Sequence, residues 1–367
     1  MKPFIKKIGS ATHYLTHHTL VLINALVTLF MLLGALSTVV PVGRPCILPY
    51  FGLFYPFWIV LTVCFLCYWT IRRKRLLLLP LATLLLCFGC LRCTFTLPIG
   101  RDNANDTNIT LLTYNIFGLK SRKQLEKVRT LVFEQDADIV CLQEFGGETN
   151  GVNLNNIISK FEDKYPYHHI WYKTQNEHFW LGNATFSKYP IVNKTTIDYE
   201  SKYNLSIASD IVVDNDTLRI INNHLESFKF TPNELAQFKD ALNNQDSTLK
   251  HSTATLWRKM NAAYRLRTPQ AEQVAKAVKN SPYPVVVCGD FNDVPQSYAY
   301  RKIQRQNLID IANKAGSGYQ YTYNKHSMLV KIDHILVDKQ FAPTAFKVIH
   351  NDISDHYPTI GSFNIKK

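Results

Sequence analysis

The first 100 residues contain no aspartate and no glutamate, although they carry nine lysines and arginines. Long apolar runs fill most of this segment, and these runs have no polar face. A helix in the core of a soluble domain is usually shorter and keeps one polar side. The absence of acidic residues and of polar faces therefore argues against a soluble helical domain at this end of the chain.

Three apolar runs stand in this segment, at about residues 19–40, 50–71 and 76–97. Each is close to the roughly 20 residues that a helix needs to cross a bilayer, so we predict three transmembrane helices. The first run is longer than the roughly 7–15 apolar residues of a signal peptide, and two more follow it. Because the connection between the second and third runs is very short, a re-entrant pair is the alternative.

Basic residues predict the orientation of these helices. Lys2, Lys6 and Lys7 precede the first run, and residues 72–75 (RRKR) separate the second from the third. Only Arg44 lies between the first two runs. By the positive-inside rule the amino terminus and the RRKR segment lie in the cytoplasm. We therefore expect a multi-pass protein of the cell membrane, with everything after the third helix on the extracytoplasmic side.

The rest of the chain has too few cysteines for a disulfide framework. Only Cys141 and Cys288 fall there, each within an apolar run. Several of the other six cysteines have the spacing of zinc ligands, as at Cys87 and Cys90. They lie inside the apolar runs, where thiolates are costly to bury, so we interpret them as small packing residues.

The remainder also lacks a strong positive charge. Nine of the 41 lysines and arginines lie in the first 100 residues, which leaves 32 basic against 28 acidic residues. Proteins that hold nucleic acid through many phosphates usually have a large basic excess. A net charge of +4 does not favour such a grip, although it leaves room for a local basic patch. No repeat or low-complexity stretch is present.

These features divide the chain into three parts. Residues 1–100 are predicted to form a membrane domain, residues 101–108 a polar linker, and residues 109–367 one large domain with its own core. Strand patterns of both the alternating and the continuous apolar kind are mixed with helical patterns in the large domain. This mixture predicts an α/β sandwich rather than a purely parallel sheet.

One stretch of the large domain, residues 284–293 (PVVVCGDFND), carries unusual chemistry. Four apolar residues predict a buried strand, and Asp290 and Asn292 then follow it. Side chains two residues apart on a strand point the same way, so this acid and this amide face one side. A partly buried carboxylate needs a partner, a metal or a hydrogen-bond network. Taken alone, the stretch also fits an ordinary turn.

Polar residues of the same kinds recur at the ends of other predicted strands. One such loop would mean little, but six loops that each deliver an acid, an amide or a histidine suggest a single site. The residues concerned are Asn115, Glu144, His224, Asp290 with Asn292, Asp333, and Asp355 with His356.

The motifs around these residues, TYNI, LQEF, NNHLES, GDFND, IDHILV and SDHYP, resemble those of the endonuclease/exonuclease/phosphatase superfamily. The resemblance extends over residues 109–365. It implies a four-layer α/β sandwich, with two packed mixed β-sheets flanked by helices, preceded here by the three transmembrane helices. It also implies a metal-dependent hydrolase that cleaves phosphodiesters or phosphomonoesters by attack of water.

The resemblance also implies a metal site. Glu144 is the expected main ligand of Mg²⁺, with Asn115 beside it and Asp355 completing the site. Mn²⁺ is the expected substitute. Mg²⁺ prefers oxygen ligands and keeps several waters, which suits so small a protein ligand set.

Catalytic roles are implied for five further residues. Asp290 would orient or deprotonate the attacking water, and Asn292 would hold that water or a phosphate oxygen. His356 would donate to a phosphoryl oxygen, with Asp333 behind it to orient the imidazole. His224 would contact the phosphate from the other side. Asp333 or its neighbour His334 can face inward, but not both; the family pattern favours Asp333.

The substrate is not named by these motifs. A lipid headgroup, a nucleotide or nucleic acid remains possible, as does a monoester or a diester, and no protein partner can be inferred. Arg258 and Arg265 are candidate substrate-binding residues, although a solvated helix face explains them equally well. The phosphate-contacting tyrosine of some family members has three candidates: Tyr172, Tyr189 and Tyr203. An extracytoplasmic nuclease and a catalytically silent binding module are the alternatives to a membrane-anchored phosphoesterase.

Overall fold

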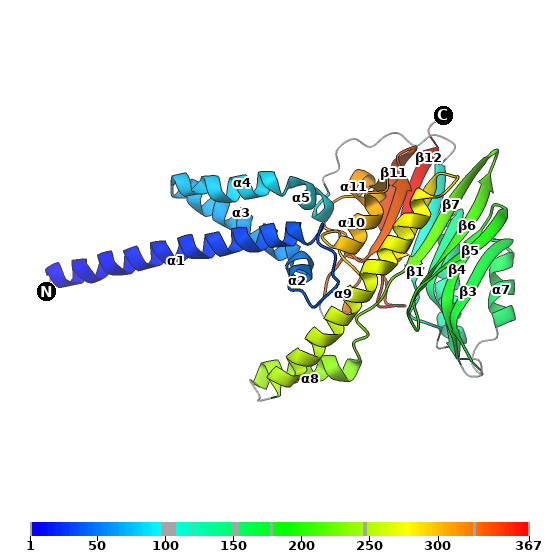
Figure 1. The fold of residues 1–367 in the computed structure, drawn as a ribbon, viewed down its shortest axis with the longest axis horizontal. Helices are drawn as coiled ribbons and strands as arrows, with labels where there is room; N and C mark the ends of the chain where they lie inside the picture. The colour runs from blue at the N-terminus through cyan, green and yellow to red at the C-terminus, as the bar shows by residue number, and fades with distance from the viewer. Residues whose placement is uncertain are drawn as a thin grey trace.

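The computed structural model describes residues 2–96, 108–119, 121–148, 154–176, 179–244, 248–325 and 328–365. Its shape is elongated, with a group of helices at the amino-terminal end projecting from one side of a two-sheet body (Figure 1). The predicted linker at 101–108 lies almost entirely outside the described residues, which resume at Asn108 with the first strand.

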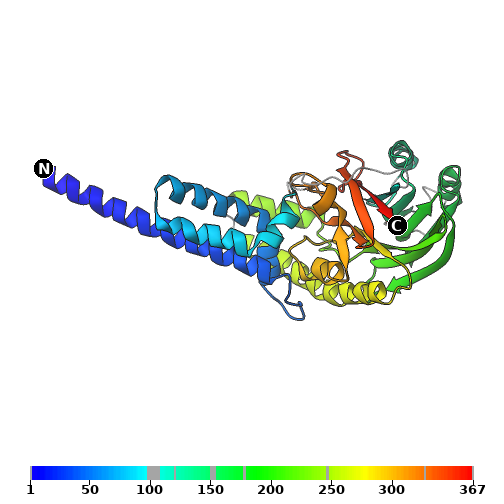
Figure 2. The same ribbon diagram turned by 90° about the horizontal axis from the view of Figure 1, so that it is seen from above.

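The amino-terminal group begins with one long helix. Helix α1 is followed by shorter helices, and α3 and α4 run back beside each other (Figures 1 and 2). The helices are α1 (Lys2–Leu36), α2 (Leu48–Leu53), α3 (Tyr55–Ile71), the 3-10 helix η1 (Arg75–Leu77), α4 (Leu78–Leu86) and α5 (Phe88–Thr94).

The predicted number of spanning helices, three, was too high for the part of the chain that the structure describes. Only residues 13–36 of α1 form one helix long and apolar enough to cross a membrane. The second apolar run is divided at Phe54, where α2 ends and α3 starts with Pro56 in its first turn. The third run bends by 69° between α4 and α5, so it counts as a span only if the bent pair is taken together.

Run length alone could not reveal these breaks. Pro56 lacks a backbone N–H and suits the first turn of a new helix, so it marks a restart inside an uninterrupted apolar sequence. Helix α1 itself differs from a soluble core helix, because only 22% of its most apolar window is buried.

The body consists of two six-stranded mixed sheets. The first has the order β11-β12-β1-β2-β4-β3 and the second the order β5-β6-β7-β8-β10-β9. The strands are β1 (Asn108–Asn115), β2 (Ile139–Glu148), β3 (Tyr167–Gln175), β4 (Phe179–Ser187), β5 (Ile191–Asp198), β6 (Leu205–Val213), β7 (Asp216–His224), β8 (Val285–Asp290), β9 (Leu308–Asp310), β10 (Asp333–Asp338), β11 (Phe341–Val348) and β12 (Thr359–Ile365).

Each sheet contains one parallel pair at its centre. Strand β1 pairs in parallel with β2, and β7 pairs in parallel with β8, whereas the other pairs are antiparallel. Parallel neighbours end at the same edge of their sheet. The carboxyl ends of β1, β2, β7 and β8 therefore meet at one end of the sandwich.

Three apolar clusters account for the layers. One fills the space between the two sheets, with Leu111 and Cys141 on one side and Val286 and Ile335 on the other. A second packs helices against the first sheet, and a third packs helices against the second sheet. The helices of the body are α6 (Arg122–Glu134), α7 (Leu154–Glu162), α8 (Pro232–Asn244), α9 (Leu249–Lys279), α10 (Tyr298–Gln304) and α11 (Ile311–Ala315). Two packed mixed sheets flanked by helices are thus confirmed.

The amino-terminal helices are docked firmly onto the body. The Tyr50 ring of α2 stacks on Trp257 of α9 with ring centroids 4.4 Å apart. Gln296 donates through Nε2 to the Cys90 carbonyl at 3.0 Å and to Thr94 Oγ1 at 2.8 Å. Ser37 of the segment after α1 donates to the Gln296 carbonyl. The apolar amino-terminal part and the sandwich therefore share a specific interface.

Candidate active site

Asp290 occupies the centre of the site because of strand register. It ends β8, directly opposite His224 on β7 and directly opposite Asp333 on β10. Two chemically active neighbours are thereby placed on either side of one carboxylate. All three side chains are almost fully buried.

Asn115 connects this sheet to the other one. Its Nδ2 donates to Asp290 Oδ2 at 3.0 Å and to Glu144 Oε1 at 3.2 Å. Asn115 ends β1 of the first sheet, and Asp290 ends β8 of the second. One amide group therefore holds two carboxylates that come from different sheets.

Glu144 reaches the site because its strand is irregular. The pairing of β2 with β4 shifts between Leu142 and Phe145, and Glu144 itself has a φ of 50°. A left-handed backbone is unusual for glutamate and often marks a functional position. The bulge turns this carboxylate toward Asn115, whereas a regular strand would continue its alternation.

Asn292 follows Asp290 and also has a left-handed backbone, with a φ of 51°. Its backbone N–H donates to Asp290 Oδ1 at 2.7 Å, and its Nδ2 donates to Asp290 Oδ2 at 3.1 Å and to the Leu225 carbonyl at 2.9 Å. Gly289 precedes the acid with a φ of 125°, and a Cβ there would lie 2.1 Å from the Asn223 carbonyl oxygen. The GDFND segment thus fixes Asp290 from both flanks.

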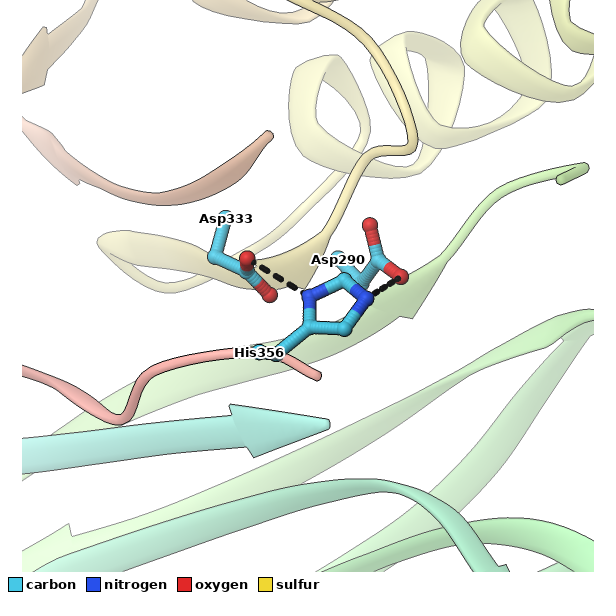
Figure 3. Close-up of side chains that lie close together, drawn as sticks. All are labelled: Asp290, Asp333 and His356. Atoms are coloured by element: carbon cyan, nitrogen blue, oxygen red, sulfur yellow. Dashed lines mark hydrogen bonds and ion pairs between the residues drawn. The ribbon is translucent and has the colours of Figure 1, made fainter. Parts of the chain in front are cut away.

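His356 and Asp333 form a hydrogen-bonded pair beside Asp290. His356 Nδ1 lies 2.9 Å from Asp333 Oδ2, and His356 Nε2 lies 3.8 Å from Asp290 Oδ2 (Figure 3). Burial lowers the affinity of this imidazole for a proton, but the charges of Asp333 and Asp290 outweigh it and raise the pKa of His356 to about 10. The imidazole is therefore a cation and a hydrogen-bond donor at neutral pH.

His224 differs from His356 in its protonation. Its Nε2 lies 3.8 Å from Asp290 Oδ2 and 3.8 Å from Glu144 Oε1, and it has no hydrogen-bond partner among the described residues. Burial lowers the pKa of His224. This buried ring nitrogen faces the same two carboxylates that Asn115 joins.

Asp355 approaches from the carboxyl-terminal loop. Its carboxylate lies 3.5 Å from Lys325 Nζ, and the preceding Ser354 donates to the Asn115 carbonyl at 2.8 Å. That hydrogen bond ties the loop before β12 to the end of β1. Asp355 is thereby held at the same edge of the sandwich as Glu144.

A cavity of about 230 Å³ opens at this point, lined by Glu144, Asp290, Asn292, Asp355 and His356 together with apolar side chains. Burial raises the pKa of Asp290, and burial raises the pKa of Glu144 to about 7. The Glu144 side chain is nevertheless 24% exposed, because it faces the cavity. Burial is the largest cause of both shifts.

The donor set fits a divalent cation. Four carboxylates meet at the site, and the facing cations are His356 and Lys325, which leaves a negative excess. The carboxylates are those of Glu144, Asp290, Asp333 and Asp355. Oxygen-rich sites of this kind suit Mg²⁺ and similar cations. Asn115, however, presents its N–H group to Glu144 and Asp290, so its amide must turn before its oxygen could act as a ligand.

The compact group of Asp290, Asp333 and His356 also has ligand atoms within 4.8 Å of one another. His356 Nδ1 is already bonded to Asp333, and the imidazole carries a proton at neutral pH. The trio therefore forms one buried group in which the imidazole lies between two carboxylates.

The structure resolves the choice between Asp333 and His334. Asp333 faces His356, whereas His334 Nε2 lies 3.0 Å from the Asp293 carbonyl oxygen on the opposite side of the strand. The eight residues expected at the catalytic and metal sites are brought together. The two basic candidates, Arg258 and Arg265, do not join them. Both are exposed on α9 and do not line the cavity.

A tyrosine missed by sequence reasoning stands at the cavity. Tyr323 lines it, with its ring 5.1 Å from that of His356, whereas Tyr172, Tyr189 and Tyr203 do not. Lys325 and Phe117 also line the cavity and were not expected there. Tyr323 and Lys325 come from the loop before β10, where no strand or helix pattern signals their position. Phe117 has a φ of 54°, a left-handed backbone conformation that no sequence motif predicts.

A family model described as the endonuclease/exonuclease/phosphatase family matches residues 112–356, which include all eight residues expected at the catalytic and metal sites. The chain belongs to this family. It is a hydrolase that acts on phosphoester bonds, in a family whose members depend on divalent metal ions. A second model, described as a domain of unknown function, matches residues 17–94. Comparison with curated proteins gave no match.

Solved structures share this fold at low sequence identity. An endonuclease/exonuclease/phosphatase from Beutenbergia cavernae has 15% identity and a TM-score of 0.51, over 71% of this chain and 72% of that one. A family protein from Leptotrichia buccalis has 14% identity and a TM-score of 0.51, over 70% and 99%. A 3′ phosphatase from Neisseria, bound to a product DNA hairpin, has 16% identity and a TM-score of 0.50, over 70% and 99%.

The Asp333→Asn variant tests the electrostatic pairing of His356. Removing the Asp333 charge should lower the midpoint of the His356 titration by at least about one pH unit, because the remaining burial favours the neutral ring. Histidine-labelled protein followed by NMR measures that midpoint. Asp338→Asn, on the same strand but away from the ring, should leave it in place. An unchanged midpoint in Asp333→Asn would show that the pair does not control this imidazole.

Proposed function

We propose that the protein is a membrane-anchored phosphoesterase that uses Mg²⁺ to hydrolyse a phosphodiester or phosphomonoester by in-line attack of water. The observation that carries this proposal is the arrangement around Asp290. Asn115, His224, Asn292 and His356 surround that one carboxylate at the floor of a cavity.

The proposed cation ligands are Glu144 and Asp355, with Asn115 joining them once its amide has turned. When bound, the cation would neutralise charge on the phosphoryl oxygens and on the developing transition state. Mn²⁺ has similar ligand preferences and is expected to substitute. Glu144 is well suited to this role, since a nearby cation would offset the burial that raises its pKa.

Asp290 would orient the attacking water and accept its proton. The two hydrogen bonds from Asn292 and the one from Asn115 fix the carboxylate, which lines the cavity. Its pKa, which burial raises, favours a proton acceptor over a permanently ionised acid. Asn292 in this arrangement positions Asp290, in addition to any contact that it makes with substrate.

The two histidines would act on the phosphate from opposite sides. His356, held as an imidazolium by Asp333, would donate to a phosphoryl oxygen and stabilise the charge that develops there. His224 offers a free Nε2 that would contact a second phosphoryl oxygen or the leaving group. No covalent enzyme intermediate is needed for this chemistry.

Anchoring to a membrane is the second part of the proposal. Residues 13–36 provide one apolar helix, and leucines such as Leu22, Leu26 and Leu29 are exposed along it. Exposed leucines in a row are costly in water and favourable in lipid. The three lysines before this helix favour a cytoplasmic amino terminus, so one crossing by α1 would leave the sandwich on the extracytoplasmic side.

An extracytoplasmic nuclease is the second candidate function. It is supported by the exposed Arg258 and Arg265 on α9, which could contact phosphates of a long substrate beyond the cavity. The Neisseria structure with bound DNA shows that the fold accommodates nucleic acid in that relative. A silent binding module is disfavoured, because the proposed catalytic and metal-binding residues all converge on one site.

Asp290→Asn is the main test of the mechanism. The variant should lose about 100-fold or more of kcat, because it removes the proton acceptor while keeping the shape of the side chain. The measurement is a panel of lipid, nucleotide and plasmid DNA phosphoesters with Mg²⁺ on the full-length protein. Asp216→Asn, an exposed acid at the start of β7, is the matched control. Salt-sensitive cleavage of plasmid alone would select the nuclease, and equal rates in Asp290→Asn would refute the proposed base.

Metal removal tests the ligand assignment separately. Treatment with EDTA should abolish activity, and Mg²⁺ or Mn²⁺ should restore it. In Glu144→Gln the Mg²⁺ concentration for half-maximal activity should rise by about tenfold or more, since one anionic ligand is lost. Glu134→Gln, an exposed acid at the end of α6, should show the wild-type requirement. A wild-type Mg²⁺ requirement in Glu144→Gln would show that Glu144 is not a ligand of the cation.

Reporter fusions test the membrane arrangement. Alkaline phosphatase, which is active only outside the cytoplasm, should be active when fused after Lys367 of the full chain in a bacterial inner membrane. Green fluorescent protein at the same position should be dark, and the protein should remain in the membrane pellet after alkaline washing. Fluorescent, soluble fusions would contradict both the anchor and its orientation.

A further inference from the structure

The catalytic cavity has a second wall that the proposed chemistry does not use. Besides the acids and His356, the cavity is lined by apolar side chains that come from elements far apart in the sequence. These residues are Leu53 of α2, Phe230 and Leu235 at the start of the α8 region, and Met328 and Val330 of the loop before β10.

Phosphoester cleavage alone does not require this wall. Each of these side chains is only partly buried, so apolar surface is left facing the cavity. Exposed apolar surface costs free energy in water, and the cost is recovered when an apolar ligand covers it. A substrate whose remainder is a sugar or a nucleotide would leave that surface without a partner.

The cavity is also poor in free positive charge for a long polyanion. Its two lysines already have acidic partners: Lys229 pairs with Glu226, and Lys325 lies 3.5 Å from Asp355. Nucleic acid would present several phosphates to this lining, and these lysines would have to leave their partners to meet them. The lining therefore favours one phosphate joined to an apolar group.

The apolar wall includes one residue of the amino-terminal helices, which project from one side of the body (Figure 1). Leu53 belongs to α2, and the next residue, Phe54, is exposed together with Phe57 of α3. The α8–α9 hairpin reaches toward the same side in both views (Figures 1 and 2). Leu242 is exposed on α8 of that hairpin. Exposed apolar residues thus lie on or beside the two helices, α2 and α8, that contribute Leu53 and Leu235 to the cavity.

We propose that this wall, defined by Leu53, Phe230, Leu235, Met328 and Val330, binds the alkyl part of an amphiphilic phosphoester from the adjacent bilayer. The inference rests on the proposed phosphoesterase function and names its substrate class as a phospholipid. The phosphate lies against Asp290, His224 and His356, and the alkyl chain runs along the apolar wall toward the helices.

Matched alkyl phosphoesters test the proposal with the full-length protein in lipid nanodiscs. Ethyl and octyl 4-nitrophenyl phosphate form the diester pair, and ethyl and octyl phosphate form the monoester pair. The octyl compound should have a kcat/KM about tenfold or more above that of the ethyl compound, because only its chain reaches the wall. This octyl-to-ethyl ratio should fall toward one in Leu235→Asn and in Phe230→Asn. Val192→Asn, an exposed residue on β5, should keep the wild-type ratio.

The outcomes separate this inference from the proposed function. Suppose that the wild-type protein hydrolyses the compounds, that Asp290→Asn abolishes this turnover, and that the wild-type octyl-to-ethyl ratio is near one. This result would overturn the alkyl site and would leave the proposed phosphoesterase function in place. If neither pair is hydrolysed, calorimetric titration with ethyl and octyl phosphate decides the matter. Tighter octyl binding that weakens in Leu235→Asn supports the alkyl site even then, and equal affinities overturn it.

Discussion

The hydrogen bond from Asn115 to Asp290 is the contact on which the site depends, because it crosses from one sheet to the other. Asn115 ends β1 and Asp290 ends β8, so the two meet only when the sheets are packed face to face with the correct alignment. The same amide also holds Glu144, and the Asn115 carbonyl receives the hydrogen bond from Ser354 that fixes the Asp355 loop. The packing of the two sheets and the geometry of the site therefore depend on the same hydrogen bonds.

Buried amides reinforce that packing away from the site. Gln143 donates to Asn222 Oδ1 at 2.7 Å, and Asn222 donates to the Ala184 carbonyl at 2.9 Å, so polar bonds link β2, β4 and β7. Buried polar groups in such networks fix one arrangement, since any slip leaves them without partners. The left-handed backbones of Glu144 and Asn292 lie next to these rigid strands, which can hold strained conformations in place.

The amino-terminal helices contribute more to the body than a tether would. Their contacts with α9 and with Gln296 place Leu53 at the cavity, so the apolar segment supplies part of the cavity wall. The same contacts join residues 2–96 to the sandwich in this structure.

Much of this protein was determined by local sequence. Continuous apolar runs before GDFND and LQEF predicted β8 and β2, and the polar residues that follow them suggested a single site. The resemblance of these motifs to a known family then implied that the site cleaves phosphoesters. The number of spanning helices was wrong, because apolar length does not show a restart at Pro56 or a 69° bend. The family resemblance already favoured Asp333 over His334, and the structure places Asp333 against His356. Tertiary structure alone decided that Tyr323 and not Tyr172 reaches the cavity, and that Arg258 stays on the surface. Short-range patterns fix which way a strand alternates, whereas the meeting of distant side chains depends on how two sheets, their bulges and their loops pack in three dimensions.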